Sequence, residues 1–317
     1  MQPPPPVDST LSAIGNTPVI KLRHVVPENS ADVFIKLESV NPTGSYKDRM
    51  ALAMIEEAEK RGTLRPGMTV VEYTGGSTGS SLAMVCAAKG YRFRVVSSDA
   101  FADEKLKTMR AFGAELEIVH SPTGAITPDL IPAMMELAKE IGSRDDCYRT
   151  DQFNNRDSVT GYAGIGRELL AQFPDGFDAF CGAVGTGGML MGVAGVLRAS
   201  LPDIRISALE PASSPVISGG VAGEHHVEGI GVGFIPPLLD ESLYDEARGI
   251  QEAEAREMCR RLAKEEGVLV GVSSGLNVAG ALQLARELGP GKAVVTVACD
   301  TGLKYLAGDL FGEQSGS

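Results

Sequence analysis

Short runs of β-branched residues alternate with longer helical stretches along most of this chain, and this alternation constrains the fold more than any other feature. A buried strand is predicted at 69–73, followed by a break and a helix at 80–89 that Gly90 ends. A glycine just after a helix supplies the left-handed backbone common at helix C-termini. Further strands are predicted at 93–96, 115–119, 177–183, 204–209 and 293–298, and further helices at 102–112, 129–141, 189–199 and 252–266.

Strands that alternate with helices favour βαβ crossovers and therefore mostly parallel sheets flanked by helices, which is the α/β class. A chain of 317 residues suits about two domains of ~100–200 residues each. The polar, irregular segment 150–157 is the predicted crossing between them. The long segment 210–237 is rich in Gly, Ser and Pro, and a loop of that length is often functional.

Charge and cysteine usage narrow the function classes. The chain carries 29 Lys and Arg against 41 Asp and Glu, a net charge of −12, which opposes binding to a nucleic-acid backbone. The five cysteines are widely spaced and form no Cys-x-x-Cys pair, so reduced thiols are expected and not disulfides or a zinc site. With four histidines and no His-Glu-x-x-His motif, no metal is expected.

No apolar run approaches the ~20 residues of a membrane-spanning helix, so no membrane association is expected. The first ten residues are proline-rich and lack the basic start and apolar core of a secretory signal. We therefore expect a cytoplasmic protein with a disordered lead-in at 1–10 and a flexible tail at 312–317.

Two glycine-rich segments, 74–79 and 185–189, each follow a predicted strand and precede a predicted helix. Glycine lets the backbone approach a ligand closely, and the helix N-terminus offers N–H groups and a positive dipole end. Both segments therefore suit a phosphate or a carboxylate. Neither matches the Walker A or the Gly-x-Gly-x-x-Gly pattern, and a tight strand-to-helix turn is the alternative for each.

A third motif, Asn-Pro-Thr-Gly-Ser-Tyr-Lys-Asp-Arg at 41–49, leads into a helix that is predicted to begin near Tyr46. Lys47 then lies in the first helical turn. The positive end of the helix dipole disfavours the charged ammonium form of a lysine, which suits a Schiff-base lysine. A solvated surface lysine is the ordinary alternative.

These motifs resemble those of the cysteine synthase family of pyridoxal-phosphate (PLP) enzymes, within the wider group that includes cystathionine β-synthase and the tryptophan synthase β subunit. The resemblance runs from about residue 11 to residue 306. In chain order its motifs are Ile-Gly-Asn-Thr-Pro at 14–18, Lys-Leu-Glu at 36–38, the lysine motif at 41–49, the first glycine segment, Gln152-Phe153, the second glycine segment, and the stretches 229–236, 265–267 and 271–275.

The resemblance implies a two-domain, tryptophan synthase β-like fold of type II PLP enzymes. In it, a smaller, mobile domain spans 42–150, and a larger, cofactor-binding domain spans 11–41 plus 151–311. Lys47 would be the catalytic residue, forming the internal aldimine and moving the Cα proton. The other implied cofactor-binding residues are Ser77, Gly185, Thr186, Gly187, Gly188, Met189 and Ser273, and the implied substrate-binding residues are Thr74, Gly75, Thr78, Gln152 and Gly229.

The chain departs from the family pattern at three places. Gly75 replaces a usual serine, and Ser77 replaces an asparagine that contacts the cofactor's 3′ oxygen. Met189 stands where threonine is common, and the stretch 154–157 after Gln152 also differs. These changes leave cofactor binding expected and the identity of the substrates open.

The resemblance implies a transferase that performs β-replacement on O-acetylserine or O-phosphoserine through an α-aminoacrylate, making L-cysteine or a related amino acid. The alternatives are a β-eliminating ammonia-lyase, a synthase that uses a non-sulfide nucleophile, and a non-catalytic binding scaffold. A homodimer is expected from the family, and the C-terminal tail of serine acetyltransferase is a possible partner.

Overall fold

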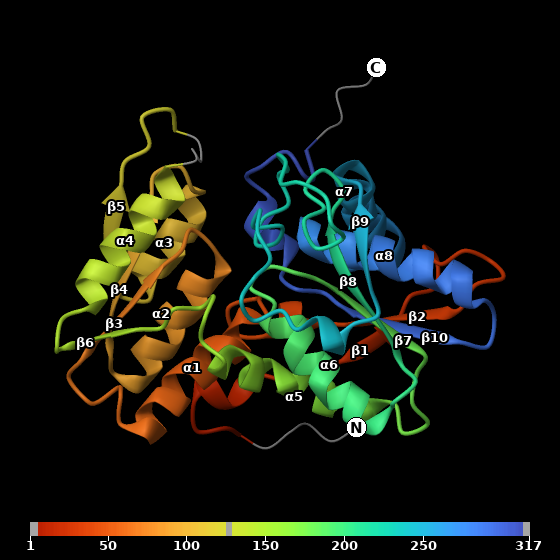
Figure 1. The fold of residues 1–317 in the computed structure, drawn as a ribbon, viewed down its shortest axis with the longest axis horizontal. Coiled ribbons are helices and arrows are strands. Elements are labelled where there is room, and N and C mark those ends of the chain that lie inside the picture. The colour runs from red at the N-terminus through yellow and green to blue at the C-terminus, as the bar shows by residue number, and fades with distance from the viewer. Residues whose placement is uncertain (1–5, 125–128, 313–317) are drawn as a thin grey trace. The chain divides into compact units, whose positions relative to one another are not determined.

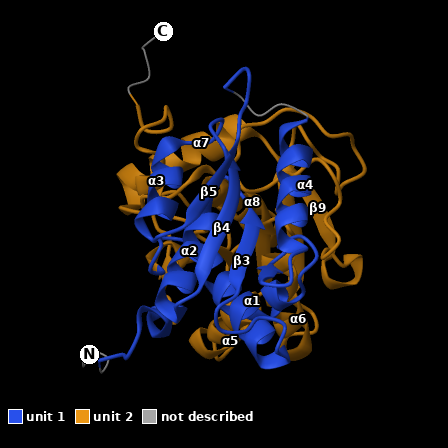
Figure 2. Cartoon of the chain, turned by 90° about the vertical axis from the view of Figure 1, so that its left-hand side faces the viewer, with its two compact units in different colours: residues 1–15, 41–161 blue, residues 16–40, 162–317 orange. Residues whose placement is uncertain are grey.

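The computed structural model describes residues 6–124 and 129–312, and these residues form two compact units. Figure 2 shows the first unit, residues 1–15 with 41–161, and the second unit, residues 16–40 with 162–317. Each unit is built on one sheet with helices packed against it (Figure 1). Residues 1–5 of the predicted lead-in and 313–317 of the predicted tail lie outside the described residues, and among the described lead-in residues 6–10 only Thr10 belongs to a regular element, the 3₁₀ helix Thr10–Ala13.

The first unit contains a four-stranded parallel sheet in the order β5-β4-β3-β6. All five residues of β3 are buried, as expected for a central strand of a parallel sheet covered on both faces. Leu130 and Met134 of α4 pack against Val71 and Val96 of the sheet. The elements are α1 Lys47–Arg61, β3 Thr69–Tyr73, α2 Ser77–Lys89, β4 Arg92–Ser98, α3 Asp103–Ala111, β5 Glu115–Val119, α4 Leu130–Gly142 and β6 Cys147–Arg149.

The second unit contains a six-stranded sheet in the order β1-β2-β10-β7-β8-β9, in which only β1 and β2 pair antiparallel. Helix α8 is buried along most of its length and packs on the sheet. The elements are β1 Val19–Lys21, β2 Asp32–Lys36, the end of α5 Asp157–Gln172, β7 Ala179–Ala183, α6 Gly188–Ser200, β8 Arg205–Pro211, β9 Glu246–Ile250, α7 Glu252–Arg261, α8 Val272–Leu288 and β10 Ala293–Val297, with short 3₁₀ helices at Glu38–Val40, Glu241–Leu243 and Gly302–Tyr305.

The predicted α/β class with mostly parallel sheets is confirmed, and strands β3 and β5 have the predicted bounds. Helix α2 begins three residues before the predicted start, and the predicted helix at 252–266 ends as a π-helical turn, Leu262–Glu266. The strands β1, β2, β6 and β9 and the helices α5 and α8 were not predicted. Over residues 272–282 helix α8 is buried on all sides, so it lacks the polar stripe that marks a surface helix.

The compact units place residues 151–161 with the first unit, whereas the sequence placed its boundary at 150. The reason is close packing, because a Cβ on Gly161 would lie 2.5 Å from the carbonyl oxygen of Arg49 in α1. Gln152 also hydrogen-bonds to Glu72 of β3. Residues 11–15 likewise belong to the first unit, and the mobility of the smaller domain stays a prediction.

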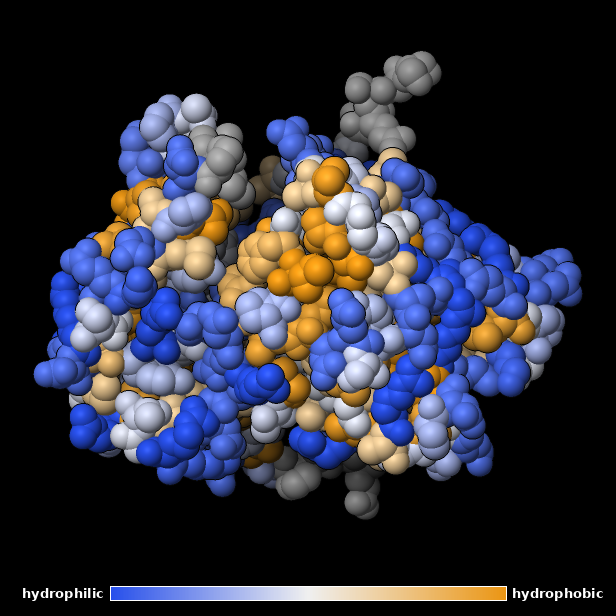
Figure 3. Space-filling model, in the orientation of Figure 1, coloured by the Kyte–Doolittle hydropathy of each residue, from blue (hydrophilic) through white to orange (hydrophobic). Residues whose placement is uncertain are grey.

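Other sequence expectations concern single features. All five cysteines are free, as predicted, and four of them are buried. The predicted long loop contains no helix or strand between Pro211 and Glu241, and it exposes Val221, Phe234 and Ile235. Figure 3 shows hydrophobic surface over this part of the second unit. Within the described ranges, no helix is long and apolar enough to cross a membrane, and no cluster of three His, Cys, Asp or Glu side chains could hold a metal.

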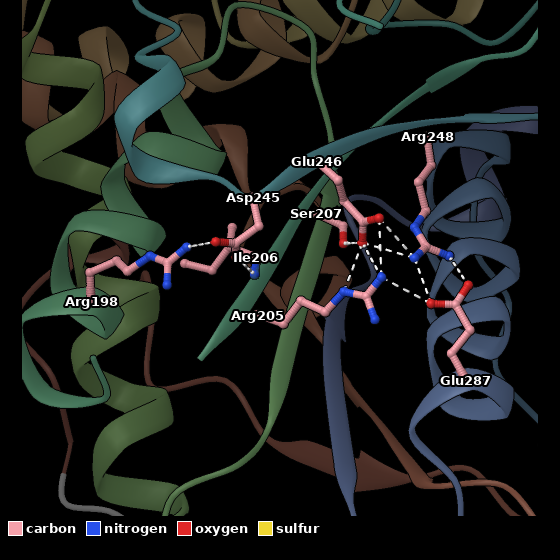
Figure 4. Close-up of polar contacts among 8 residues, drawn as sticks. All are labelled: Arg198, Arg205, Ile206, Ser207, Asp245, Glu246, Arg248 and Glu287. Carbon is pink, nitrogen blue, oxygen red and sulfur yellow. Dashed lines mark hydrogen bonds and ion pairs between the residues drawn. The ribbon is translucent and has the colours of Figure 1, made fainter. Parts of the chain in front are cut away.

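Ion pairs fasten the edge strand β9 to its neighbours (Figure 4). Arg205 of β8 donates to Glu246 of β9 over 3.0 Å and lies 2.9 Å from Glu287 at the end of α8. Arg248 of β9 donates to Glu287 over 2.6 Å and also contacts Glu246. An edge strand exposes unpaired backbone groups, so charged side chains that anchor it also protect it from pairing with other chains.

We predict that Glu287→Gln lowers the free energy of unfolding at neutral pH and has less effect in acid. The hydrogen bond from Arg248 lowers the pKa of Glu287 below its ordinary value of 4.5. A carboxyl group with a lowered folded-state pKa stabilises the fold above its unfolded pKa, and this contribution disappears as pH falls through the folded pKa.

Urea unfolding at pH 7, 5 and 3 measures this difference between wild type and variant. Glu224→Gln is the matched control, because Glu224 is exposed and makes no side-chain ion pair among the residues described. A difference for Glu287→Gln that stays constant across all three pH values would contradict the prediction.

Candidate active site

Lys47 is held at the start of α1 by its neighbours in the lysine motif. Its side chain is buried, with 8% exposure, and its Nζ lies 4.8 Å from the centroid of the Tyr46 ring. The backbone N–H of Lys47 donates to Ser45 Oγ over 3.2 Å. The carboxylate of Asp48 accepts from the N–H and the hydroxyl of Thr43 over 2.8 and 2.5 Å. The predicted helix start is therefore correct, and the lysine projects from a tightly bonded turn.

The first glycine segment joins β3 to α2 at the carboxyl edge of the parallel sheet. The Gly76 N–H donates to Thr74 Oγ1 over 3.2 Å, and Gly76 is the N-cap residue of α2, without a side-chain cap. Thr78 Oγ1 donates to Gln152 Oε1 over 2.9 Å. Two of the predicted substrate-binding residues thus meet within the first unit, beside a helix N-terminus that suits an anion.

Glu72, which the sequence analysis did not single out, lies in β3 and holds the first glycine segment in place through hydrogen bonds. Its buried carboxylate accepts from the N–H groups of Tyr73 and Gln152 over 2.9 and 3.0 Å and from the hydroxyl of Thr150 over 2.7 Å. Burial raises the pKa of Glu72 to about 7, although these hydrogen bonds favour the charged form. A glutamate inside an otherwise apolar strand was the signal in the sequence that could have revealed it.

The second glycine segment joins β7 to α6 and is closed tightly by the backbone around it. A Cβ on Gly185 would lie 2.3 Å from the carbonyl oxygen of Gly229, and a Cβ on Gly187 would lie 3.1 Å from the backbone nitrogen of Leu239. Gly187 has a positive φ of 86° and is the N-cap residue of α6. Glycine is therefore required at both positions, and the structure brings together the predicted residues Gly185 and Gly229.

Thr186 and Met189 differ in what they can offer to a ligand of this segment. Thr186 Oγ1 accepts from the Gly188 N–H over 3.4 Å and lies within the segment. The Met189 side chain is buried, and its Cε lies 2.6 Å from where a Cβ on Gly182 would be. Because the thioether packs on β7, the backbone N–H of Met189 is the group that can serve a ligand.

Ser273 lies in the first turn of α8, and its neighbour Ser274 is already engaged. Ser274 Oγ accepts from the Cys299 N–H over 2.8 Å, whereas the hydroxyl of the buried Ser273 has no hydrogen bond to any described residue. One turn later, Asn277 Oδ1 accepts from the Ala183 N–H over 2.8 Å and its Nδ2 donates to the Val297 carbonyl over 2.9 Å. Asn277 therefore ties α8 to the end of β7, where the second glycine segment begins.

The predicted site residues divide between the two units. The first unit holds the lysine and the predicted substrate residues before 160, and the second holds the rest. Within the first unit are Lys47, Thr74, Gly75, Ser77, Thr78 and Gln152, and within the second are Gly185, Thr186, Gly187, Gly188, Met189, Gly229 and Ser273. Residues 185–188, which we call the glycine cradle, lie at the N-terminus of α6 and fit the phosphate of PLP. The Ser273 hydroxyl fits the ring nitrogen of PLP.

We predict that Glu72→Gln lowers the free energy of unfolding by about 1–3 kcal/mol. The amide NH₂ of the variant is itself a donor, and it would face one of the three donors that point at the carboxylate in the wild type. The folded-state pKa of about 7 lies above the ordinary value of 4.5, so the stability that Glu72 contributes is full below pH 4.5 and is lost as pH rises through 7. The difference between wild type and variant should therefore be larger at pH 5 than at pH 8.

Denaturant unfolding at both pH values tests this, with Glu115→Gln as the control at an exposed position of the same sheet. If Glu72→Gln lowers the free energy of unfolding no more than Glu115→Gln does, Glu72 does not hold the segment in place.

Comparisons with known proteins agree over nearly the whole chain. A family profile described as pyridoxal-phosphate dependent enzyme matches residues 10–300. The cysteine synthase of Staphylococcus aureus is 46% identical over 310 residues, which cover 96% of this chain and 97% of that protein. The resemblance predicted from the motifs is confirmed.

Solved structures show the same fold. The structure of an O-ureido-L-serine synthase has a TM-score of 0.90 at 38% identity and covers 99% of this chain and 98% of that one. The cysteine synthase of Entamoeba histolytica has a TM-score of 0.92 at 31% identity, with 100% and 95% covered. The predicted two-domain fold class is confirmed, and the chain belongs to the family of pyridoxal-phosphate-dependent enzymes.

Proposed function

We propose that this enzyme catalyses β-replacement on an O-activated L-serine, with O-acetylserine as the first substrate and sulfide as the nucleophile, to give L-cysteine. The buried Lys47 at the tightly bonded start of α1 is the observation that carries the proposal. The high identity to a cysteine synthase over nearly the full length supports the choice of substrates.

Lys47 is the residue to which we assign both covalent attachment of the cofactor and movement of the proton at the substrate Cα. When bound, PLP supplies an electron sink for the carbanion at that carbon. A lysine on a helix start is well placed for this work, because the turn around Ser45 and Asp48 fixes its backbone. Such a side chain acts as a general base on one defined atom.

The glycine cradle, Gly185 to Gly188, binds the cofactor phosphate through backbone N–H groups at the start of α6, and Met189 adds its own N–H. Ser273 donates a hydrogen bond to the ring nitrogen. Because a hydroxyl is neutral, it does not stabilise a protonated ring as a carboxylate would. A neutral partner at the ring nitrogen therefore favours substrates whose departing β-substituent takes up the developing negative charge.

The first glycine segment binds the substrate carboxylate through Thr74, Gly75 and Thr78, with Gln152 fixed by Thr78 and Glu72. Ser77 would offer the cofactor's 3′ oxygen a hydroxyl on a shorter side chain than the asparagine of the family pattern. The carbonyl oxygen of Gly229 packs against Gly185 of the cradle, and we assign Gly229 to substrate binding because the family resemblance implies it. These assignments need no metal.

A synthase reaction with a different nucleophile is the second candidate. The changes at Gly75 and Ser77 favour it, and so does the likeness to a protein named O-ureido-L-serine synthase. A β-eliminating activity would use the same residues without a nucleophile. For its assembly and place in the cell, we propose a homodimer in the cytoplasm that can accept the tail of serine acetyltransferase, as the family resemblance implies.

A panel of O-acetylserine, O-phosphoserine, serine and threonine against sulfide, thiosulfate and homocysteine tests the function, with the products identified by mass spectrometry. O-acetylserine with sulfide should give L-cysteine at the highest rate. Lys47→Ala should lower kcat by roughly 10²–10⁴-fold, the scale of a positioned general base. Lys60→Ala, in the same helix with an exposed side chain, is the control and should keep the wild-type rate.

Pyruvate and ammonia formed from serine faster than any replacement product would favour the eliminating enzyme. Failure of every β-substituted serine to react would overturn the proposed function.

A further inference from the structure

Gly75, where the family pattern has a serine, is covered by the ring of Phe101. A Cβ on Gly75 would lie 2.1 Å from Cγ of Phe101 and 2.2 and 2.3 Å from its two Cδ atoms. Such distances do not occur between real atoms, so the ring fills the space that a side chain at position 75 would need. The Phe101 ring can occupy this position only because residue 75 has no side chain.

Phe101 lies in the turn that follows β4, and β4 is the neighbour of β3 in the sheet. Strands β3 and β4 are parallel neighbours, so their carboxyl ends meet at one edge, and Thr74 N–H donates to the Val96 carbonyl over 2.9 Å. The turn after β4 is well anchored, since Phe101 N–H donates to the Ser98 carbonyl over 3.2 Å. Asp99 Oδ1 in the same turn accepts from the Ser121 N–H over 2.8 Å.

The ring changes the chemistry of the segment as well as its shape. Phe101 is half-buried and packs against the core cluster that includes Val71 and Tyr73. It puts an apolar surface against Gly75, two residues before the start of α2, where the family serine would have put a hydroxyl. An apolar wall excludes water and strengthens the binding of one carboxylate, but it offers no hydrogen bond to a second polar group.

We propose that Phe101, together with Gly75, determines substrate specificity at the first glycine segment. The inference rests on the proposed function, in which this segment binds the amino-acid substrate. Phe101 favours serine derivatives with a neutral β-substituent, such as an O-acyl group, over those with an anionic one, such as O-phosphoserine. The β-oxygen of a serine derivative is three bonds from its carboxylate carbon, so we place the β-substituent near the ring when this segment holds the carboxylate. A doubly charged phosphate there would lose water without gaining donors, which costs binding free energy.

The test is a double-mutant cycle of Gly75→Ser, Phe101→Ala and the combined variant, with kcat and KM measured for O-acetylserine and O-phosphoserine. Gly75→Ser alone should lower kcat/KM for both substrates by about tenfold or more, because the ring must move. Adding Phe101→Ala should restore most of it. Phe101→Ala alone should raise the preference for O-phosphoserine by about tenfold, mainly through KM, on the scale of one pocket contact.

Phe112→Ala, at the exposed end of α3 in the same unit, is the control and should leave the preference unchanged. Titration of PLP-loaded protein with L-serine and O-phosphoserine, followed through the visible absorbance of the cofactor, gives a half-saturation concentration for each amino acid that requires no nucleophile and no complete replacement reaction. Lack of any replacement activity in the wild type would refute the proposed function alone, and the titration would still decide the inference. Additive effects in the cycle, or the same O-phosphoserine preference in Phe101→Ala and wild type, would overturn it.

Discussion

Parallel strands end at one edge of a sheet, and the helix that follows each strand starts there with unpaired backbone N–H groups. Both units of this protein use that constraint. In the first unit β3 runs through Gly75 and Gly76 into α2, and in the second unit β7 runs through the cradle into α6. In the proposed function, anion binding therefore depends mainly on backbone groups, and glycine is needed where another backbone segment comes close.

Buried polar side chains hold these two edges in shape. Glu72 gathers three donors beneath the first glycine segment, and Asn277 fixes the end of β7 before the second. Each satisfies backbone groups that would otherwise be buried without a partner, which is costly in a protein interior. Neither needs to touch a substrate. Their effect is to keep Gln152 and the cradle in one geometry, so that the residues in contact with ligands can be short and neutral.

The sequence predicted the fold class and most long elements because amphipathic helices and β-branched strands have distinct periods. It could not predict α8, because a helix buried all round has no polar face, nor the three-residue strands β1 and β6, which are set by pairing with distant strands. The motif residues came from the family resemblance. Three further residues were not predicted, because their roles arise from contacts between segments far apart in the chain: Glu72, Asn277 and Phe101.

We propose that Lys47, and no other lysine of this chain, holds the cofactor. The most direct measurement is reduction of the PLP-loaded wild type with borohydride, proteolysis, and mass spectrometry of the peptides. We expect a pyridoxyl-phosphate adduct on the peptide that contains Lys47, in about one equivalent per chain. An adduct on the buried Lys36 or on any other lysine, with Lys47 unmodified, would contradict it.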